Sequence, residues 1–142
     1  MARSTACTNA RCTPATPPGC GPAACSIPDV RLQRVYRVVV VVPCGHVEAL
    51  LAGVRRDAAL VLDEYGDWAW LSAPGEEQFR PLPGATPARG TPGTIECVPS
   101  RRVEFCIAHD EATLARLLAA IRAHHPWQVP AITVDEPTRP LW

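Results

Sequence analysis

A run of β-branched residues constrains the fold of this 142-residue chain more than any other feature. Residues 35–42 read Val-Tyr-Arg-Val-Val-Val-Val-Val, which is typical of a central strand buried on both faces of a sheet. Pro43-Cys44-Gly45 ends the run, because proline cannot continue the strand's hydrogen-bond ladder. We therefore expect the core of the domain to form around this strand.

Two later segments have the apolar spacing of amphipathic helices. The first follows Gly45, and Arg55 and Arg56 lie in its last turn, where positive charge suits the helix dipole. The second begins after Asp110, a good N-cap, and ends before Pro126. The apolar positions recur with helical spacing: Val47, Leu50, Leu51 and Val54 in the first helix, and Leu114, Leu117, Leu118 and Ile121 in the second.

The remaining patterned segments predict strands. They cover residues 65–71, 94–98, 101–107 and 129–134, and the third of these alternates apolar and polar residues as in a half-buried antiparallel strand. Residues 79–93 are rich in proline and glycine, and we expect an extended loop there. Trp68 and Trp70 fall on one face of their strand, where they either join the core or form a partner surface.

With residues 94–98 and 101–107 counted as one interrupted strand, the order of these elements is β-α-β-β-α-β, the ferredoxin-like plan of the α+β class. It predicts a four-stranded antiparallel sheet with two helices on one face, formed by residues 34–136. Residues 1–33 contain five prolines and no aromatic residue, so we expect a disordered Cys/Pro-rich tail there. Residues 137–142 are expected to form a short C-terminal tail.

Charge and composition exclude several classes of function. The 14 basic and 14 acidic residues cancel, whereas a nucleic-acid-binding protein normally has a basic surplus. All the basic residues are Arg, which excludes a Schiff-base or P-loop lysine. The longest apolar run is far below the roughly 20 residues that span a bilayer, and residues 1–7 lack the apolar stretch of a secretory signal. We therefore expect a cytoplasmic protein without nucleic-acid or membrane partners.

Three segments resemble known protein families. Residues 125–132, His-Pro-Trp-Gln-Val-Pro-Ala-Ile, are similar to the His-Pro-Tyr-Glu-Val-Pro-x-Ile segment of CutA, the divalent-cation-tolerance protein. Residues 78–87, with the Gly90, Gly93, Glu96 and Val98 that follow, resemble a linker-and-strand signature of the PII-like domain inserted in GTP cyclohydrolase I type 2 homologues. Tyr65, Trp70 and Gly75 fit the strand before this signature, and residues 102–104 fit the strand after it. Residues 35–136 therefore resemble a stand-alone PII/CutA-like module.

This resemblance implies a trimer of ferredoxin-like subunits with ligand sites in the clefts between them. It does not imply metal-dependent hydrolysis, because the segments that carry the dinuclear metal ligands of the larger family have no counterpart in the sequence. In PII-like proteins the loop and the adjacent cleft hold nucleotides or small anions, and arginine forks suit such ligands. The candidate ligand-binding residues are Arg80, Arg89, Arg101, Arg102, Gly84 and Gly90, with a structural loop and solvated arginines as the alternative.

The cysteines of the N-terminal segment are candidates for metal binding. Cys7, Cys12, Cys20 and Cys25 provide four thiols, enough for copper(I), zinc or an iron–sulfur cluster. Two reversible disulfides, or thiols without a specific role, are the alternatives. His124 and His125 are further candidate metal ligands or acid–base groups, although a helix-capping and contact role is the simpler interpretation.

Cys44 and His46 are the one sequence-local pair that suggests a nucleophile with a base. No third, orienting residue can be identified from the sequence, so we do not favour an enzyme. The leading hypothesis is a non-enzymatic trimeric protein that binds or senses a small ligand. The alternatives are a copper- or zinc-handling protein that uses the N-terminal cysteines, and a small redox or hydrolytic enzyme that uses Cys44.

Overall fold

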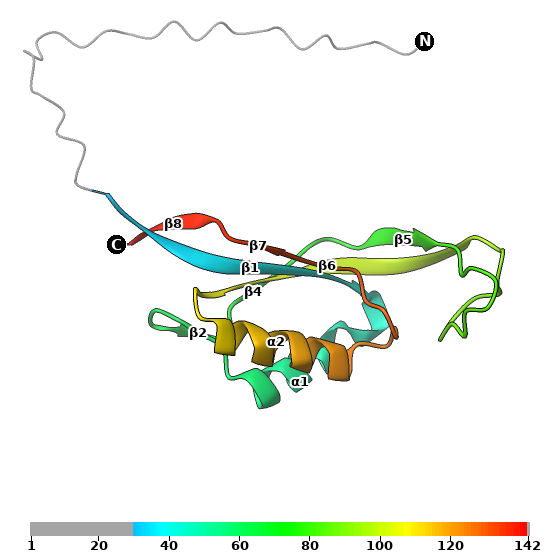
Figure 1. Ribbon diagram of the computed structural model, residues 1–142, viewed down its shortest axis with the longest axis horizontal. Helices are drawn as coiled ribbons and strands as arrows, with labels where there is room; N and C mark the ends of the chain where they lie inside the picture. Colours follow the sequence, from blue (N-terminus) through cyan, green and yellow to red (C-terminus); the bar gives the residue numbers. More distant parts are fainter. Residues whose placement is uncertain (1–29, 142) are drawn as a thin grey trace, which may run out of the picture.

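A computed structural model describes residues 30–141 of the chain, whose main sheet is antiparallel and has two helices on one face (Figure 1). The two long central strands are β1 (Arg31–Pro43) and β6 (Glu96–Ala108), which pair from Val35–Ala108 to Pro43–Ser100. The strand order is β4-β6-β1-β7, with β4 at Ala69–Leu71 and β7 at Ile132–Asp135. The α+β class and the central position of the valine-rich strand are therefore confirmed.

The sheet has six strands, so the expected count of four is wrong. β5 (Gly75–Phe79) pairs with the beginning of β6, and β8 (Thr138–Leu141) pairs with the beginning of β1. The physical reason is length: β1 and β6 have 13 residues each, so their ends extend past the helices and accept further partners.

The two strand segments on either side of Pro99 form one continuous strand, β6. Proline is tolerated there because pairing with β1 stops at Ser100, so Pro99 lies beyond the end of β1 and is paired only with Glu76 of β5. The residues expected as a C-terminal tail contain β8, which pairs with Arg31–Arg34. Residues 1–29 of the expected N-terminal tail lie outside the described residues, and residues 31–33 belong to β1.

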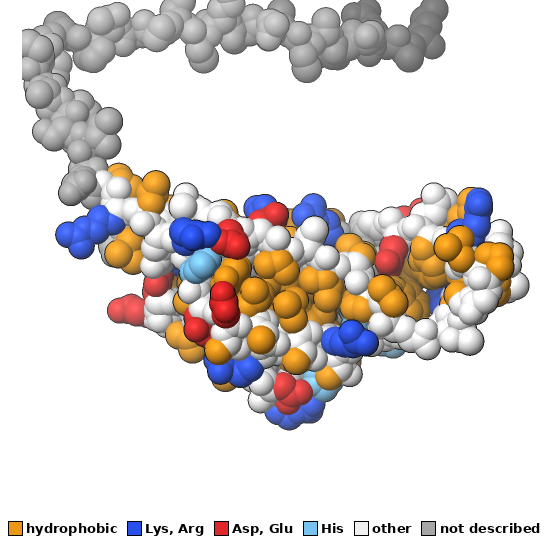
Figure 2. Space-filling view, in the orientation of Figure 1, with side chains coloured by type: hydrophobic (Ala, Val, Ile, Leu, Met, Phe, Trp, Pro, Cys, Tyr) orange, Lys and Arg blue, Asp and Glu red, His pale blue; other side chains and the backbone are white. Residues whose placement is uncertain are grey.

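The core lies between the sheet and the helices α1 (Val47–Ala58) and α2 (Glu111–His124). Asp110 caps α2 as expected, since its Oδ2 accepts a hydrogen bond from the Thr113 amide at 2.7 Å. The buried side chains come from alternate positions of the strands and from the predicted helix stripes: Tyr36, Val38, Val40 and Val42 of β1, Val103, Phe105 and Ile107 of β6, and Val47, Leu50, Leu51, Val54, Leu117 and Ile121 of the helices. Figure 2 shows hydrophobic side chains gathered between these layers.

The strand expected at residues 65–71 is divided in two. β2 (Val61–Leu62) and β3 (Tyr65–Gly66) form a separate hairpin, and the chain then turns at Asp67, whose φ is +56°, before β4 begins. Trp68 and Trp70 are 42% and 49% exposed. The core alternative for these tryptophans is therefore wrong, and both rings are available on the described surface.

No helix within residues 30–141 combines the length and the apolar character needed to cross a membrane.

Candidate ligand-binding site

The β5–β6 hairpin forms an arm that extends beyond the helices (Figure 1). Its loop, residues 80–95, folds back on itself, because the Gly93 amide donates to the Pro81 carbonyl at 2.8 Å. Gly90 has a φ of +90°, and a Cβ at that position would lie 2.5 Å from Cγ of Glu96. Only glycine satisfies both the backbone conformation and the close approach. The loop is thus a shaped element with a defined path.

The segment after α2 crosses from the helix layer to the sheet, where it leads into β7 beside β1. His125 is buried, and its Nε2 lies 2.8 Å from the Val41 carbonyl oxygen, which can only accept a hydrogen bond. Nε2 therefore carries the proton, and Nδ1 accepts from the Trp127 amide at 3.0 Å. Because both ring nitrogens are used inside the domain, His125 shapes the segment and offers no lone pair to a metal.

Trp127 belongs to this segment and connects it to the arm. Its Nε1 donates to Oε2 of Glu77 on β5 at 3.2 Å, and the same oxygen accepts from the Ser100 hydroxyl at 3.2 Å. The Trp127 ring also meets Phe79 edge to face, with ring centroids 5.8 Å apart. One carboxylate and one aromatic pair therefore hold the arm against the 125–131 segment.

A cavity of about 550 Å³ lies between the arm and this segment. Its wall combines the rings of Phe79 and Trp127 with the guanidinium-bearing side chains of Arg80 and Arg89. Neither arginine forms an ion pair with another residue in the described part of the chain. The volume is that of a small-molecule site, and apolar walls with a few polar groups are the usual composition of such sites. Hydrophobic side chains also gather at this end of the molecule in Figure 2.

A smaller cavity of about 380 Å³ also borders Trp127. Trp127 and Arg89 border both cavities, and the smaller one is also lined by Cys44 and His46. These two residues belong to a short 3₁₀ turn, η1 (Cys44–His46), that precedes α1. Cys44 is a free, half-buried thiol, and His46 is exposed.

The structure brings together only part of the predicted ligand-binding set. Arg80 and Arg89 line the larger cavity, whereas Arg101 and Arg102 lie in β6 opposite Val42 and Val41 and are not part of its wall. Gly84, at a φ of +88°, and Gly90 shape the loop and do not line the cavity. Sequence reasoning missed Glu77 and did not assign a role to Trp127. The His-Pro-aromatic motif was a signal for Trp127, but no local pattern distinguishes Glu77 from Glu76.

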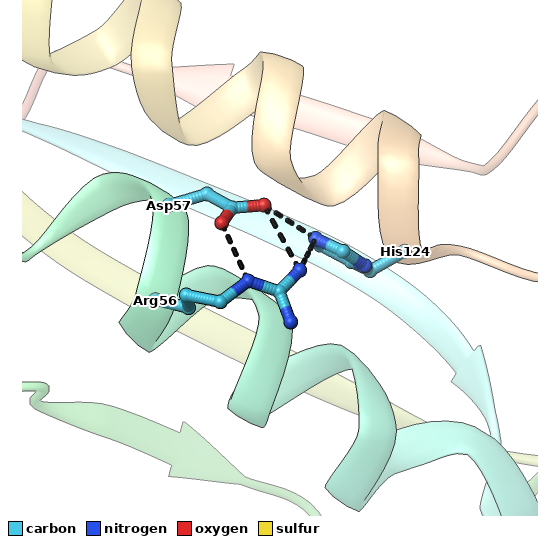
Figure 3. A network of polar contacts seen from close by, with 3 residues as sticks. All are labelled: Arg56, Asp57 and His124. Carbon is cyan, nitrogen blue, oxygen red and sulfur yellow. Dashed lines mark hydrogen bonds and ion pairs between the residues drawn. The ribbon is translucent and has the colours of Figure 1, made fainter.

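His124 contacts Asp57 and Arg56 of α1 (Figure 3). Its Nε2 lies 2.6 Å from Oδ2 of Asp57, and Nε of Arg56 donates to Oδ1 of the same carboxylate at 2.9 Å. These two partners lower the pKa of Asp57, with the Arg56 hydrogen bond as the larger cause. The imidazole lies against Gly53, where an added Cβ would come within 2.2 Å of two ring carbons. His124 therefore connects the two helices.

The metal hypotheses have different outcomes for different residues. Within residues 30–141 no three His, Cys, Asp or Glu side chains are grouped so that they could hold a metal ion. His124 and His125 contact different elements and do not form a common site. Cys7, Cys12, Cys20 and Cys25 lie outside the described residues, so the copper or zinc hypothesis for these thiols stays a prediction.

Comparison with known proteins gives relatives for this domain. No protein-family model matches the chain. The chain is 36% identical over 107 residues to the GTP cyclohydrolase 1 type 2 homolog of Mycobacterium leprae, an alignment that covers 75% of this chain and 27% of the relative. It is 38% identical over 96 residues to the protein of the same name in Mycobacterium tuberculosis, covering 68% of this chain and 24% of the relative.

A solved structure has a similar fold. The Bacillus cereus protein related to NIF3 superposes with a TM-score of 0.60 at 23% identity, over 75% of this chain and 26% of that protein. The chain thus spans about a quarter of the length of the relatives it matches. It is homologous to one segment of the GTP cyclohydrolase 1 type 2 homologs and has a NIF3-like fold. The predicted resemblance to these homologues is confirmed, and the relationship to PII and CutA stays a prediction.

Proposed function

We propose that this protein is a binding module for a small ligand that carries both a flat ring and an anionic group, such as a nucleotide. The observation that carries the proposal is the cavity between the arm and the 125–131 segment, where Phe79 and Trp127 lie beside Arg80 and Arg89. Aromatic side chains offer a face for a planar ring, and arginine forks match phosphate or carboxylate oxygens. The proposal assigns no catalytic residue.

The wall of this cavity comes from two segments that are far apart in sequence, and the Glu77–Trp127 hydrogen bond connects them. A ligand that contacts both segments would add to this connection and stabilise the arm against the domain. Ligand occupancy would thereby change how firmly the arm is held, which is the property that a sensing module requires.

We also infer that the subunit is ferredoxin-like and that three copies assemble with this cavity at a boundary between subunits. Two facts support the inference: both helices lie on one face of the sheet, and Trp70 of β4 is 49% exposed on the described surface. An exposed tryptophan on a strand is typical of a contact surface. Sedimentation equilibrium should give a trimer at micromolar concentration, and a stable monomer there would contradict the inference.

A ligand screen tests the binding proposal directly. Thermal-shift measurements on the full chain would compare inorganic phosphate, adenosine, AMP and ATP, followed by titration of tryptophan fluorescence with the best of them. Arg89→Gln should weaken binding roughly ten- to a hundredfold, because a hydrogen bond to a charged group is worth about 1.5–3 kcal/mol. Arg116→Gln, an exposed position on α2 whose guanidinium bonds only Thr113 among the described residues, is the matched control. Equal affinities of the two variants would refute the proposed site.

A further inference from the structure

A second cleft, of about 800 Å³, lies between the β2–β3 hairpin and β8. Tyr65, Trp68 and Leu141 line it, and the two aromatic side chains are 73% and 42% exposed. None of these residues belongs to the ligand cavity at the arm. A cluster of exposed aromatic residues in a concave surface is typical of a docking site and unusual on a surface that faces only water.

The cleft has an acidic rim. Asp63 and Glu64, in the turn of the hairpin, both line it. Arg139 of β8 forms an ion pair with Asp63, which connects the hairpin to the sheet, whereas Glu64 has no ion-pair partner among the described residues. The Asp67 amide donates to the Leu60 carbonyl at 3.0 Å and closes the base of the hairpin. The cleft therefore presents aromatic rings beside the Glu64 carboxylate.

The N-terminal sequence contains the chemistry that such a cleft recognises. Residues 11–17 read Arg-Cys-Thr-Pro-Ala-Thr-Pro, in which two prolines are separated by two residues and a basic residue stands three positions before the first. Segments with two prolines at this spacing adopt polyproline II conformation at low entropic cost and dock in aromatic-lined grooves. Arg3 and Arg11 are the charged residues before Asp29, so the segment is basic and complements the acidic rim.

We propose that residues 11–17 bind the cleft between the β2–β3 hairpin and β8 of the same chain, with Pro14 and Pro17 on Tyr65 and Trp68 and with Arg11 beside Glu64. The covalent connection of residues 11–17 to β1 favours this segment over other occupants of the cleft. β1 begins at Arg31, which pairs with Leu141, itself part of the cleft wall, so the first described strand begins at the rim of the cleft (Figure 1).

The length of the connecting chain also fits. Residues 18–30 can span up to roughly 40 Å when extended, and seven residues of polyproline II cover about 20 Å. A connection of this length gives the tethered segment a millimolar effective concentration at the cleft. Even a weak proline-rich contact would therefore be occupied within one chain.

The experiment uses the four tryptophan indole N–H resonances of the full-length, ¹⁵N-labelled chain. Trp68 is assigned by the loss of its resonance in Trp68→Phe, and Trp127, at the arm, serves as the internal reference. The double variant Pro14→Ala/Pro17→Ala should shift the Trp68 resonance and leave Trp127 unchanged. Pro22→Ala/Pro28→Ala, which removes two prolines outside the motif, is the matched control and should leave both in place.

Addition of a synthetic peptide of residues 8–20 provides the second measurement. The peptide should return the Trp68 resonance of Pro14→Ala/Pro17→Ala to its wild-type position, and should bind the wild-type chain at least about tenfold more weakly because the tethered segment competes. Equal Trp68 positions in the two double variants would overturn the proposal. A Trp68 shift that changes with protein concentration would also overturn it, since the segment would then come from a second copy.

Discussion

The centre of the sheet and the β5–β6 arm are stabilised in different ways. In the centre, side chains from β1, β6 and both helices are almost completely removed from water, as with Val38, Leu50 and Ile107, which are all 0% exposed. The arm is held to the 125–131 segment by few and specific contacts, namely the Glu77 carboxylate with Trp127 and the Phe79–Trp127 ring pair. Its loop contains glycines at positive φ. Burial of apolar side chains in the centre therefore provides most of the free energy of folding, whereas the arm forms the wall of a shaped site.

The largest change in the free energy of unfolding should come from a substitution in the centre of the sheet. Phe105→Ala removes a ring that is 2% exposed and leaves a cavity between the sheet and the helices, so we expect a loss of about 3–5 kcal/mol in the free energy of unfolding. Leu82→Ala, at a residue of the arm loop that is 68% exposed, should change it by less than about 0.5 kcal/mol. Urea unfolding followed by circular dichroism measures both changes. A similar loss in the two variants would contradict the difference between the centre and the arm.

Removing the Glu77 carboxylate should loosen the arm. Glu77→Ala leaves the Trp127 indole N–H and the Ser100 hydroxyl without their acceptor, which costs about 1–3 kcal/mol. The loss should appear as faster hydrogen exchange in β5, with little change in β1. Glu76→Ala, at the neighbouring exposed position, is the control. Unchanged exchange in β5 would show that the Glu77 contact does not hold the arm.

Gly84 and Gly90 both have a positive φ, but only at Gly90 would an added Cβ also lie close to another side chain. Substitutions at these two positions therefore separate the effect of backbone strain from that of close approach. Gly90→Ala combines a φ of +90° with a contact of 2.5 Å to Glu96, and should destabilise the arm by about 1–3 kcal/mol. Gly84 has a φ of +88°, but a Cβ added there would meet no atom within 4 Å, so Gly84→Ala should have the smaller effect. Proteolysis of the loop under native conditions ranks the two variants, and a greater susceptibility of Gly84→Ala would contradict the expected order.

The smallest effect concerns the connection between the helices. Arg56 and His124 lower the pKa of Asp57, so the folded state is stabilised by the ionised carboxylate. This contribution is present above the unfolded-state pKa of Asp57 and is lost as the pH falls through the lower, folded-state pKa. Asp57→Asn should therefore be less stable than wild type at neutral pH, and the difference should disappear at acidic pH.

Thermal unfolding across this pH range gives the measurement for Asp57. Asp67→Asn, at a residue of the hairpin whose positive φ asparagine also tolerates, is the control and should keep a constant offset from wild type. A difference between Asp57→Asn and wild type that persists at acidic pH would show that the carboxylate's charge is not the cause.

The sequence alone was enough to identify the elements in which apolar residues recur with a regular spacing. The valine run of β1, the stripe of α1 and the Asp110 cap of α2 are all found where they were expected, because local pattern and burial agree there. The same reasoning merged β3 with β4, since aromatic residues on both sides of Gly66-Asp67 gave the pattern of one strand and concealed the turn at Asp67. It also missed the extra strands, which depend on how far β1 and β6 extend.

The candidate site was only partly predictable, because its residues are distant in sequence. Arg80 and Arg89 were identified from their places in the loop, whereas Arg101 and Arg102 belong to the sheet and lie outside the cavity wall. Hydrophobic periods are local, so the α+β class, the central strand and the two helices could be read directly from the chain. The contact of Glu77 with Trp127 and the use of His125 inside the fold could not, because they join residues 50 and 84 positions apart. Only packing of the whole domain brings such residues within hydrogen-bonding distance.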